Sequence, residues 1–191
     1  MPKRPGVNQD RLVEASLELI QEQGEQGLTF VALAKKLGIK PPSLYNHVRS
    51  IDDLKYILRL RGLRLLESDL KNAVIGRSES AALHSLCHAY RHFAQTQPAL
   101  YRMTLASTEH DDADLQAAGR ASLEVLLAVL SGYGLEGERA LHAIRCLRSA
   151  LHGFVSLEIA GGFAMPLDLD DSFELLIRQQ EQGLRELPPR G

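Results

Sequence analysis

The sequence contains no tryptophan and only two cysteines, Cys87 and Cys146, which are far apart and form no CxxC pair. Two isolated cysteines exclude a disulfide framework and the paired-cysteine zinc motifs, and buried, reduced thiols are the simpler interpretation. Runs in which Val, Ile or Thr alternate strictly with polar residues are also missing, which argues against strands. These absences favour an all-α protein.

Long hydrophobic runs are absent as well. The longest uninterrupted apolar run, residues 125–130, is too short to cross a bilayer, and no apolar segment follows the basic start of the chain as in a signal peptide. GxSxG, HExxH and Gly-rich phosphate loops are missing too. We therefore expect a cytoplasmic protein that is not an enzyme, has no cofactor and makes no contact with a membrane.

The charges are unevenly distributed although the formal net charge is only −2. Residues 1–64 hold eleven Lys and Arg against seven Asp and Glu, whereas acidic residues outnumber basic ones in the rest of the chain. A basic front part suggests that only this part meets a polyanion. Chance unevenness in a short segment is the alternative interpretation.

Helical patterns separated by glycine and proline run along the whole chain. Apolar residues recur every three or four positions, and about nine helices are expected. Their approximate ranges are 8–23, 29–37, 41–48, 50–75, 79–96, 98–107, 112–131, 137–160 and 170–187. We predict a three-helix DNA-binding domain over 1–50, joined by the long helix of about 50–75, without a flexible linker, to a helical regulatory and dimerisation domain over 51–191.

The segment LAKKLGIKPPSLYNHV has the layout of a helix-turn-helix, with two short helices around a glycine-containing turn. In the second helix, Leu44 and Val48 are spaced to face the first. Ser43, Asn46 and His47 fall on the opposite side, which suits base edges in the major groove, and Asn pairs with adenine in bidentate fashion. The flanking cations, Lys40 and Arg49, stand where phosphates are expected.

The longer segment TFVALAKKLGIKPPSLYNHVRSIDDL resembles the signature of TetR-family transcriptional regulators, including the Thr that opens the second helix. The resemblance implies that four residues contact phosphates: Thr29, Ser43, Tyr45 and His47. It also implies that three residues lie nearest the bases: Lys40, Pro41 and Asn46. The run Lys40-Pro41-Pro42 departs from the Ser, Lys and Gly of many members, and the extra proline stiffens the start of the recognition helix.

The segments 89–105 and 151–163 resemble the C-terminal domain named for its Trp-His-Gly motif, with Leu151 in place of the tryptophan and His152 and Gly153 matching. The last two helices of TetR-like proteins usually form the dimer as a four-helix bundle. The dimer residues that follow from this are Leu151, Val155, Ile159, Phe173, Leu176 and Ile177. The alternative is that helix 137–160 is buried within the monomer.

The resemblance also implies a small-molecule effector in the C-terminal domain. The candidate pocket residues are Tyr90, Tyr101, Met103, Arg148 and His152. Arg148 and His152 are one turn apart on a largely apolar helix and need partners there, either an anionic effector, Glu158 or an acid across the dimer. The aromatic and methionine residues fit an ordinary core equally well.

Three histidines one turn apart, His84, His88 and His92, invite interpretation as a metal site. They fall beside the apolar stripe of their helix together with Arg91 and Gln95. We therefore favour a solvated or ligand-lining face and predict no metal.

The sequence as a whole predicts a ligand-responsive DNA-binding regulator, a repressor, that binds a near-palindromic operator on double-stranded DNA as a homodimer. The alternative is a helical small-ligand or metal-binding protein with a vestigial helix-turn-helix. A further possibility is that Lys3 and Arg4 form a minor-groove arm.

Overall fold

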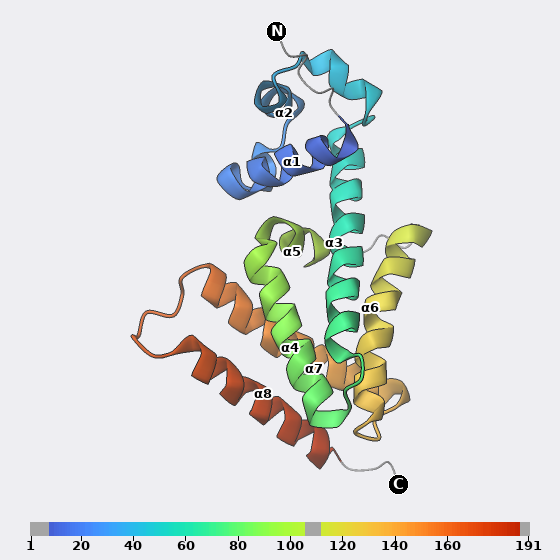
Figure 1. Cartoon of the computed structure of the whole chain (residues 1–191), viewed down its shortest axis with the longest axis vertical. Coiled ribbons are helices and arrows are strands. Elements are labelled where there is room, and N and C mark those ends of the chain that lie inside the picture. Colours follow the sequence, from blue (N-terminus) through green and yellow to red (C-terminus); the bar gives the residue numbers. More distant parts are fainter. Residues whose placement is uncertain (1–7, 106–111, 188–191) are drawn as a thin grey trace. The chain divides into compact units, whose positions relative to one another are not determined.

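The computed structural model describes residues 8–105 and 112–187, and its regular elements there are all helices (Figure 1). The predicted all-α fold is confirmed, and the elements follow the predicted order. They are α1 (Gln9–Gln23), η1 (Glu25–Gly27), α2 (Phe30–Leu37), η2 (Pro41–Asn46), α3 (Ile51–Val74), α4 (Glu79–Thr96), α5 (Pro98–Leu105), α6 (Ala113–Ser131), α7 (Gly137–Ile159) and α8 (Leu169–Glu186). Among these residues, no helix combines the length and the apolar character that crossing a membrane requires.

The described residues form two compact units. The first contains residues 8–62 and 97–105, and the second contains residues 63–96 and 112–187. The start of α3, up to Gly62, and the whole of α5 therefore belong with the N-terminal helices. The first unit extends beyond the residues 1–50 expected from the sequence, because it recruits a helix that lies some way along the chain.

Local capping interactions determine where the helices of the first unit begin and end. Thr29 has an extended backbone and its side chain accepts a hydrogen bond from the amide of Ala32, 3.2 Å away, as expected of an N-cap. Gly38 ends α2 in the left-handed conformation, with φ of 67°. The amide of Asp53 donates to the hydroxyl of Ser50 at 3.0 Å. The three predicted helix boundaries are thus confirmed.

The core of the first unit is formed by α1, α2, η2, the start of α3 and α5. Leu12, Leu33 and Leu58 are completely buried, and Met103 of α5 packs in the same apolar cluster. Gly62 allows α3 and α5 to approach closely, because a Cβ there would lie 3.1 Å from the carbonyl oxygen of Leu100. The apolar face of α5 therefore completes this core.

In the second unit, α4 packs against α6, α7 and α8 (Figure 1). The largest side chains that are completely buried here are Phe93 of α4 and Phe173 of α8. Ile177, one turn after Phe173, is also fully buried. The apolar stripes of α4 and α8 therefore face each other, as their helical spacing requires.

A buried arginine ties three segments of the second unit together. Arg91 of α4 is only 7% exposed, and its Nε donates to a carboxylate oxygen of Glu158 at 2.9 Å. Its Nη1 donates to Asp170 at 2.7 Å, and the guanidinium lies 4.8 Å from the ring centroid of Phe173 and 5.6 Å from that of Phe154. Of the two interpretations of this face, solvated or ligand-lining, the solvated one is wrong for Arg91, because its side chain is buried against carboxylates from distant parts of the chain.

Candidate functional site

The recognition element differs from the short helix predicted between Pro41 and about Val48. It is a 3₁₀ helix, η2, that ends at Asn46. Its first backbone hydrogen bond runs from the amide of Ser43 to the carbonyl of Lys40 at 2.9 Å, the i to i+3 bond of a 3₁₀ helix. The first two amides of such a helix have no partner within it, so prolines at these two positions cost no hydrogen bond. A proline also disfavours the α conformation in the residue before it, and Lys40 is extended.

The element is held in place by apolar side chains on its inner side. Leu44 is fully buried and Val48 is 2% exposed, so the predicted inward-facing pair is confirmed. On the outer side, Ser43, Asn46 and His47 are exposed. The η2 segment thus presents hydrogen-bonding groups to solvent from a fixed hydrophobic base.

All eight residues predicted to contact DNA are exposed to solvent. They lie at the N-terminus of α2, along η2 or beside it. They are Thr29, Lys40, Pro41, Ser43, Tyr45, Asn46, His47 and Arg49. The structure therefore brings the predicted set together within the first unit and leaves its side chains accessible.

Two of these side chains are positioned by their neighbours. The oxygen of Thr29 accepts the amide hydrogen of Ala32, which leaves its hydroxyl hydrogen available for an external acceptor. The ring of Tyr45 packs edge-on against Phe30, with centroids 5.0 Å apart. Tyr45 is nevertheless 61% exposed, so this contact orients the ring without covering it.

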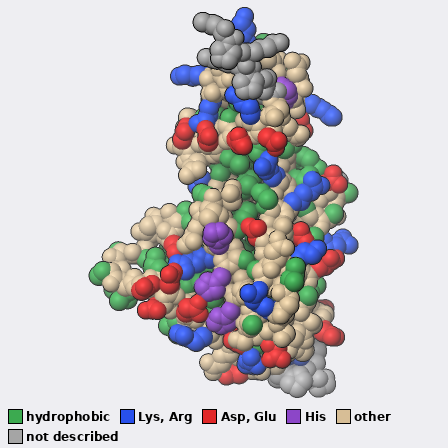
Figure 2. Space-filling model, viewed as in Figure 1, with side chains coloured by type: hydrophobic (Ala, Val, Ile, Leu, Met, Phe, Trp, Pro, Cys, Tyr) green, Lys and Arg blue, Asp and Glu red, His purple; other side chains and the backbone are tan. Residues whose placement is uncertain are grey.

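The cations of the first unit fall into two groups. Lys36 of α2 is paired with Glu18 and Glu22 of α1 at 2.9 and 2.8 Å, and the hydrogen bonds that it donates to Glu22 and to Glu18 raise its pKa. Lys40 and Arg49 have no carboxylate partner among the described residues. Lys and Arg side chains project from this unit in Figure 2. The cations beside η2 are thus available to an external anion.

Lys3 and Arg4, the possible minor-groove arm, lie outside the described residues.

The five candidate ligand-pocket residues are divided between the units. Tyr101 and Met103 are buried in α5 of the first unit, and Met103 belongs to its apolar core. Tyr90 is buried in α4 of the second unit, and His152 of α7 is half-buried. Arg148, one turn before His152, is exposed. The side chain of Arg148 reaches solvent in the protomer, so it is not a buried charge within its own chain, and a partner across the dimer stays a prediction.

Glu158, the acid proposed from the sequence as a partner for Arg148 or His152, pairs with Arg91 instead. The half-buried His152 lies near the Ser156 hydroxyl, with 3.2 Å between the hydroxyl oxygen and Nδ1.

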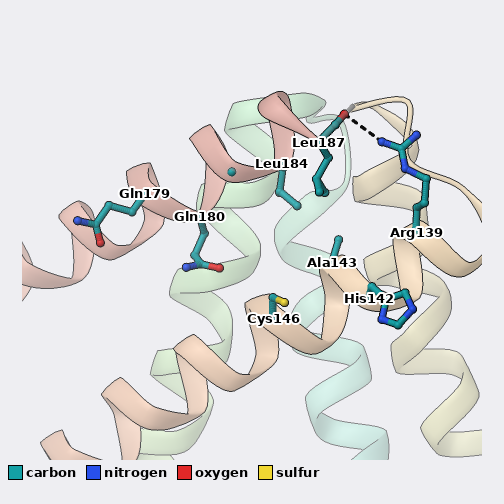
Figure 3. A pocket seen from close by; sticks show the side chains of 9 residues that line it. Arg139, His142, Ala143, Cys146, Gln179, Gln180, Leu184 and Leu187 are labelled. Atoms are coloured by element: carbon teal, nitrogen blue, oxygen red, sulfur yellow. Dashed lines mark hydrogen bonds between the residues drawn. The ribbon is translucent and has the colours of Figure 1, made fainter. Parts of the chain in front are cut away.

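A pocket of about 420 Å³ lies between α7 and α8 (Figure 3). The Nη2 of Arg139 donates to the carbonyl of Leu187 at 2.9 Å, at one end of the pocket. The lining residues are Arg139, His142, Ala143, Cys146, Gln179, Gln180, Gly183, Leu184 and Leu187. None of the five candidate pocket residues is among them. The residues that do line the pocket come from two segments far apart in the sequence, so their spacing did not predict that they would meet in one pocket.

The structure corrects the predicted dimer residues. Four of the six are buried in their own protomer and are not available to a partner: Leu151, Val155, Phe173 and Ile177. Leu176 is half-buried, and Ile159 is 41% exposed. The apolar periodicity that pointed to these residues therefore reports mainly on the protomer's own core.

A different set of residues forms the outer side of the last two helices. On α7 they recur every three or four positions, and a second row follows on α8. We call the two rows the α7–α8 face: His142, Cys146, Ser149, Gly153 and Leu157, with Leu175, Gln179 and Gly183. No atom lies within 4 Å of the position that a Cβ would take at Gly153 or at Gly183. Leu157 and Leu175 are each 50% exposed.

Comparison with known proteins identifies both units. Residues 12–54 match the family model described as "Bacterial regulatory proteins, tetR family", and residues 83–180 match "Tetracyclin repressor-like, C-terminal domain". The HTH-type transcriptional regulator YobS of Bacillus subtilis is 34% identical over 96% of each chain. The chain belongs to the TetR family. A second HTH-type regulator, Rv0681 of Mycobacterium tuberculosis, is 36% identical over 97% of this chain and 85% of its own length.

Solved structures share the fold of this TetR-family chain. A protein of unknown function from Rhodococcus superimposes with a TM-score of 0.80 at 21% identity, over 97% of this chain and all of the other. A TetR variant from Acinetobacter baumannii, solved with minocycline, gives a TM-score of 0.68 at 19% identity over 97% and 100% of the two chains. TetR-family proteins are DNA-binding transcriptional regulators, a class that is typically not enzymatic.

Proposed function

We propose that this protein is a ligand-responsive transcriptional repressor that binds a near-palindromic operator as a homodimer. The observation that carries the proposal is the exposed row Ser43, Asn46 and His47 on η2, above the buried Leu44. Polar side chains on a fixed hydrophobic base are suited to hydrogen bonding with base edges and with the phosphates beside them. The unpaired cations beside them supply the attraction to phosphate that any DNA-binding surface needs.

Within this proposal, phosphate and base contacts are made by different side chains. Thr29 and Tyr45 donate hydroxyl hydrogens to phosphates, and the N-cap of Thr29 places it where the amides at the start of α2 also face an anion. Ser43, His47 and Arg49 make further contacts with the phosphate backbone of the DNA. Asn46, with Lys40 and Pro41 before it, reads the bases. Loss of a phosphate contact then weakens binding to all sequences, whereas loss of Asn46 alters base preference.

Dimerisation is assigned to the α7–α8 face. Gly153 and Gly183 leave open space on their helices, which permits close approach of a partner helix, and Leu157 and Leu175 offer apolar area to cover. The pocket between α7 and α8 then becomes a groove that a partner's side chains fill. Two recognition elements related by a twofold axis read half-sites about 34–36 Å apart, or more if the dimer is wide.

A small-molecule effector completes the proposal. The variant from Acinetobacter baumannii binds minocycline on the same fold, which supports an effector here without identifying it. Because α3 contributes to both units, it is the segment through which an effector in the second unit changes the recognition elements. Such an effector acts only if it binds one conformation more tightly than another. We assign the C-terminal domain to the Trp-His-Gly subgroup, with Leu151 replacing the tryptophan, and place the protein with its DNA in the cytoplasm.

Selection of genomic DNA fragments by the purified protein, followed by sequencing of the retained fragments, tests this function. We expect the retained fragments to share a near-palindrome. We also expect the logarithm of the binding constant to fall linearly with the logarithm of the salt concentration, with a slope of about −0.9 for each phosphate contacted. Arg49→Ala should lower that slope by about one contact. Lys71→Ala is the matched control, because it removes a surface cation of the second unit.

Two results would separate this function from a helical ligand-binding protein with a vestigial helix-turn-helix. Recovery of the palindrome only after refolding from denaturant indicates a co-purified effector and supports the proposal. Recovery of nothing above background in low salt, both before and after refolding, contradicts it. Tyr45→Ala and Asn46→Ala variants that bind like the parent would show that η2 is not the recognition element.

A further inference from the structure

A cluster of metal-ligand side chains lies where α4 packs against α8. His84 and His88 are one turn apart on α4, and Glu174 comes from α8. One carboxylate oxygen of Glu174 is 2.6 Å from Nε2 of His88, and the other is 3.4 Å from Nδ1 of His84. One ligand atom from each of the three residues lies within 4.8 Å of the others. Figure 2 shows histidine side chains in a column with acidic side chains beside them.

The geometry of this cluster is close to that of a metal centre. Nitrogen and carboxylate ligands lie about 2.0–2.2 Å from a zinc ion, so any two of them are at most about 4.4 Å apart. Small rotations of the three side chains meet that condition. His84 is 31% exposed and His88 49%, so an ion can reach both. Without an ion, exposed pairs of this kind contribute little to stability.

A second carboxylate, that of Glu181, lies near the other ring nitrogen of His84. If His84 binds through Nδ1, its Nε2 is directed to an oxygen of Glu181, 3.7 Å away. Metal-binding histidines usually donate their other ring N–H to such a carboxylate. Glu181 is held by Ser80, Tyr133 and Arg185 at 3.1, 3.2 and 2.7 Å. Burial opposes its ionisation, but these hydrogen bonds outweigh burial and leave its pKa lowered.

The neighbouring side chains define the chemistry further. The ring of Phe173 contacts His88 edge-on, with centroids 5.5 Å apart, and so limits how far the imidazole turns. Cys87 is fully buried, burial raises the pKa of its thiol to about 12, and it is not part of the cluster. The donors are two imidazoles and one carboxylate, a set that suits zinc and its first-row neighbours better than Mg²⁺ or Ca²⁺.

We propose that His84, His88 and Glu174 bind one divalent first-row transition-metal ion, with Zn²⁺ as the occupant, and that water completes the coordination. The ion links α4 to α8 within the second unit. The separation of 86 residues between His88 and Glu174 explains why the spacing of histidines alone did not predict the site. His92, the third histidine of the row, is exposed and takes no part. This inference does not depend on DNA binding by the first unit.

The test is a Zn²⁺ titration of the full, tag-free, metal-stripped chain in competition with a chromophoric chelator. We expect one equivalent to be bound at this site. His88→Ala and Glu174→Gln should each lower affinity at least tenfold, whereas the matched control His92→Ala should bind like the parent. Saturating Zn²⁺ should raise the Tm of the parent and of His92→Ala, and should not raise that of Glu174→Gln.

Each outcome bears on the proposal. Equal Zn²⁺ affinity in the parent, His88→Ala and Glu174→Gln overturns it, as does the absence of stoichiometric binding. Circular dichroism of the metal-free variants shows whether each variant is folded. If His88→Ala is unstable, Glu174→Gln still tests the site, because it preserves the size of the side chain. A site that prefers Mg²⁺ over Zn²⁺ also overturns the assignment. Failure to bind DNA leaves all of these measurements unaffected, so the two proposals fail independently.

Discussion

Both units bury an apolar core, but they differ in the polar side chains that they bury and in the side chains that they expose. The first unit buries apolar groups and a few hydroxyls, and carries its charged groups on the outside, some of them unpaired beside η2. The second unit buries Arg91 against Glu158 and leaves leucines such as Leu157 exposed on its last helices. A hydrated, charged partner suits the first surface, and a packed protein partner suits the second. The difference indicates that each unit has a different kind of partner.

The largest expected effect comes from removing the buried charge of the second unit. Arg91→Met keeps apolar contact with the phenylalanine rings but leaves Glu158 without its cation, and should lower the free energy of unfolding by about 3–5 kcal/mol. Chemical denaturation at fixed protein concentration measures this loss. The double variant Arg91→Met/Glu158→Leu should recover most of it. A loss under about 1 kcal/mol in the single variant would mean that the ion pair is not structural.

The first unit should respond instead to loss of apolar volume. Leu44→Ala creates a cavity under η2 and should cost about 2–5 kcal/mol, with loss of DNA binding. Val31→Ala is the matched control in α2, because Val31 is 71% exposed and its truncation should change stability by no more than about 0.5 kcal/mol. Thermal unfolding and DNA affinity are measured on both. Similar stability losses in the two variants would contradict the assignment of Leu44 as the base of the element.

If the α7–α8 face is the dimer interface, a substitution on this face of the second unit should weaken dimerisation and leave the fold intact. Gly153→Leu places a large side chain in space that is open in the protomer, and should weaken dimerisation at least tenfold, about 1.4 kcal/mol, without unfolding the protomer. Gly119→Leu, at an open position on α6, should leave dimerisation unchanged. Sedimentation over a range of concentrations measures both. Equal association of the two variants would place the interface elsewhere.

The smallest expected effect concerns a side chain with two roles. Thr29→Ala removes the N-cap of α2 and should cost about 1 kcal/mol of stability, together with a uniform loss of DNA affinity. Thr29→Ser keeps the capping oxygen and the hydroxyl hydrogen, and should restore both properties. Denaturation and salt-dependent DNA binding are the two readouts. Normal DNA affinity in Thr29→Ala would limit Thr29 to a structural role.

Features determined by neighbouring residues were predictable from the sequence. The N-cap at Thr29, the left-handed Gly38 and the inward pair Leu44 and Val48 depend on residues a few positions apart, and all are confirmed. The form of η2 was not predicted, because a proline-initiated α-helix and a 3₁₀ turn share the same start signal. The double proline does not separate the two forms, because the first two amides are unpaired in both.

Features that depend on residues far apart in the chain were not predicted from the sequence. A lone arginine among histidines reads as solvated, and the partners that bury Arg91 come from positions 67 and 79 residues away. Leu151 and Val155 were assigned to the dimer interface for a similar reason. An apolar stripe on a helix does not show whether it packs against its own chain or against a second copy. Glu174 was missed as a neighbour of His84 for the same reason.

The membership of α5 in the first unit has a consequence for how the chain folds as it is made. The core around α1 is closed by Ala99 and Met103, which leave the ribosome well after the recognition element does. Until then, the apolar side of α1 that packs against α5 lacks its cover. Synthesis therefore completes the DNA-binding unit only after α4 has also emerged, and a gene fragment that stops at α3 encodes a recognition element without its full support.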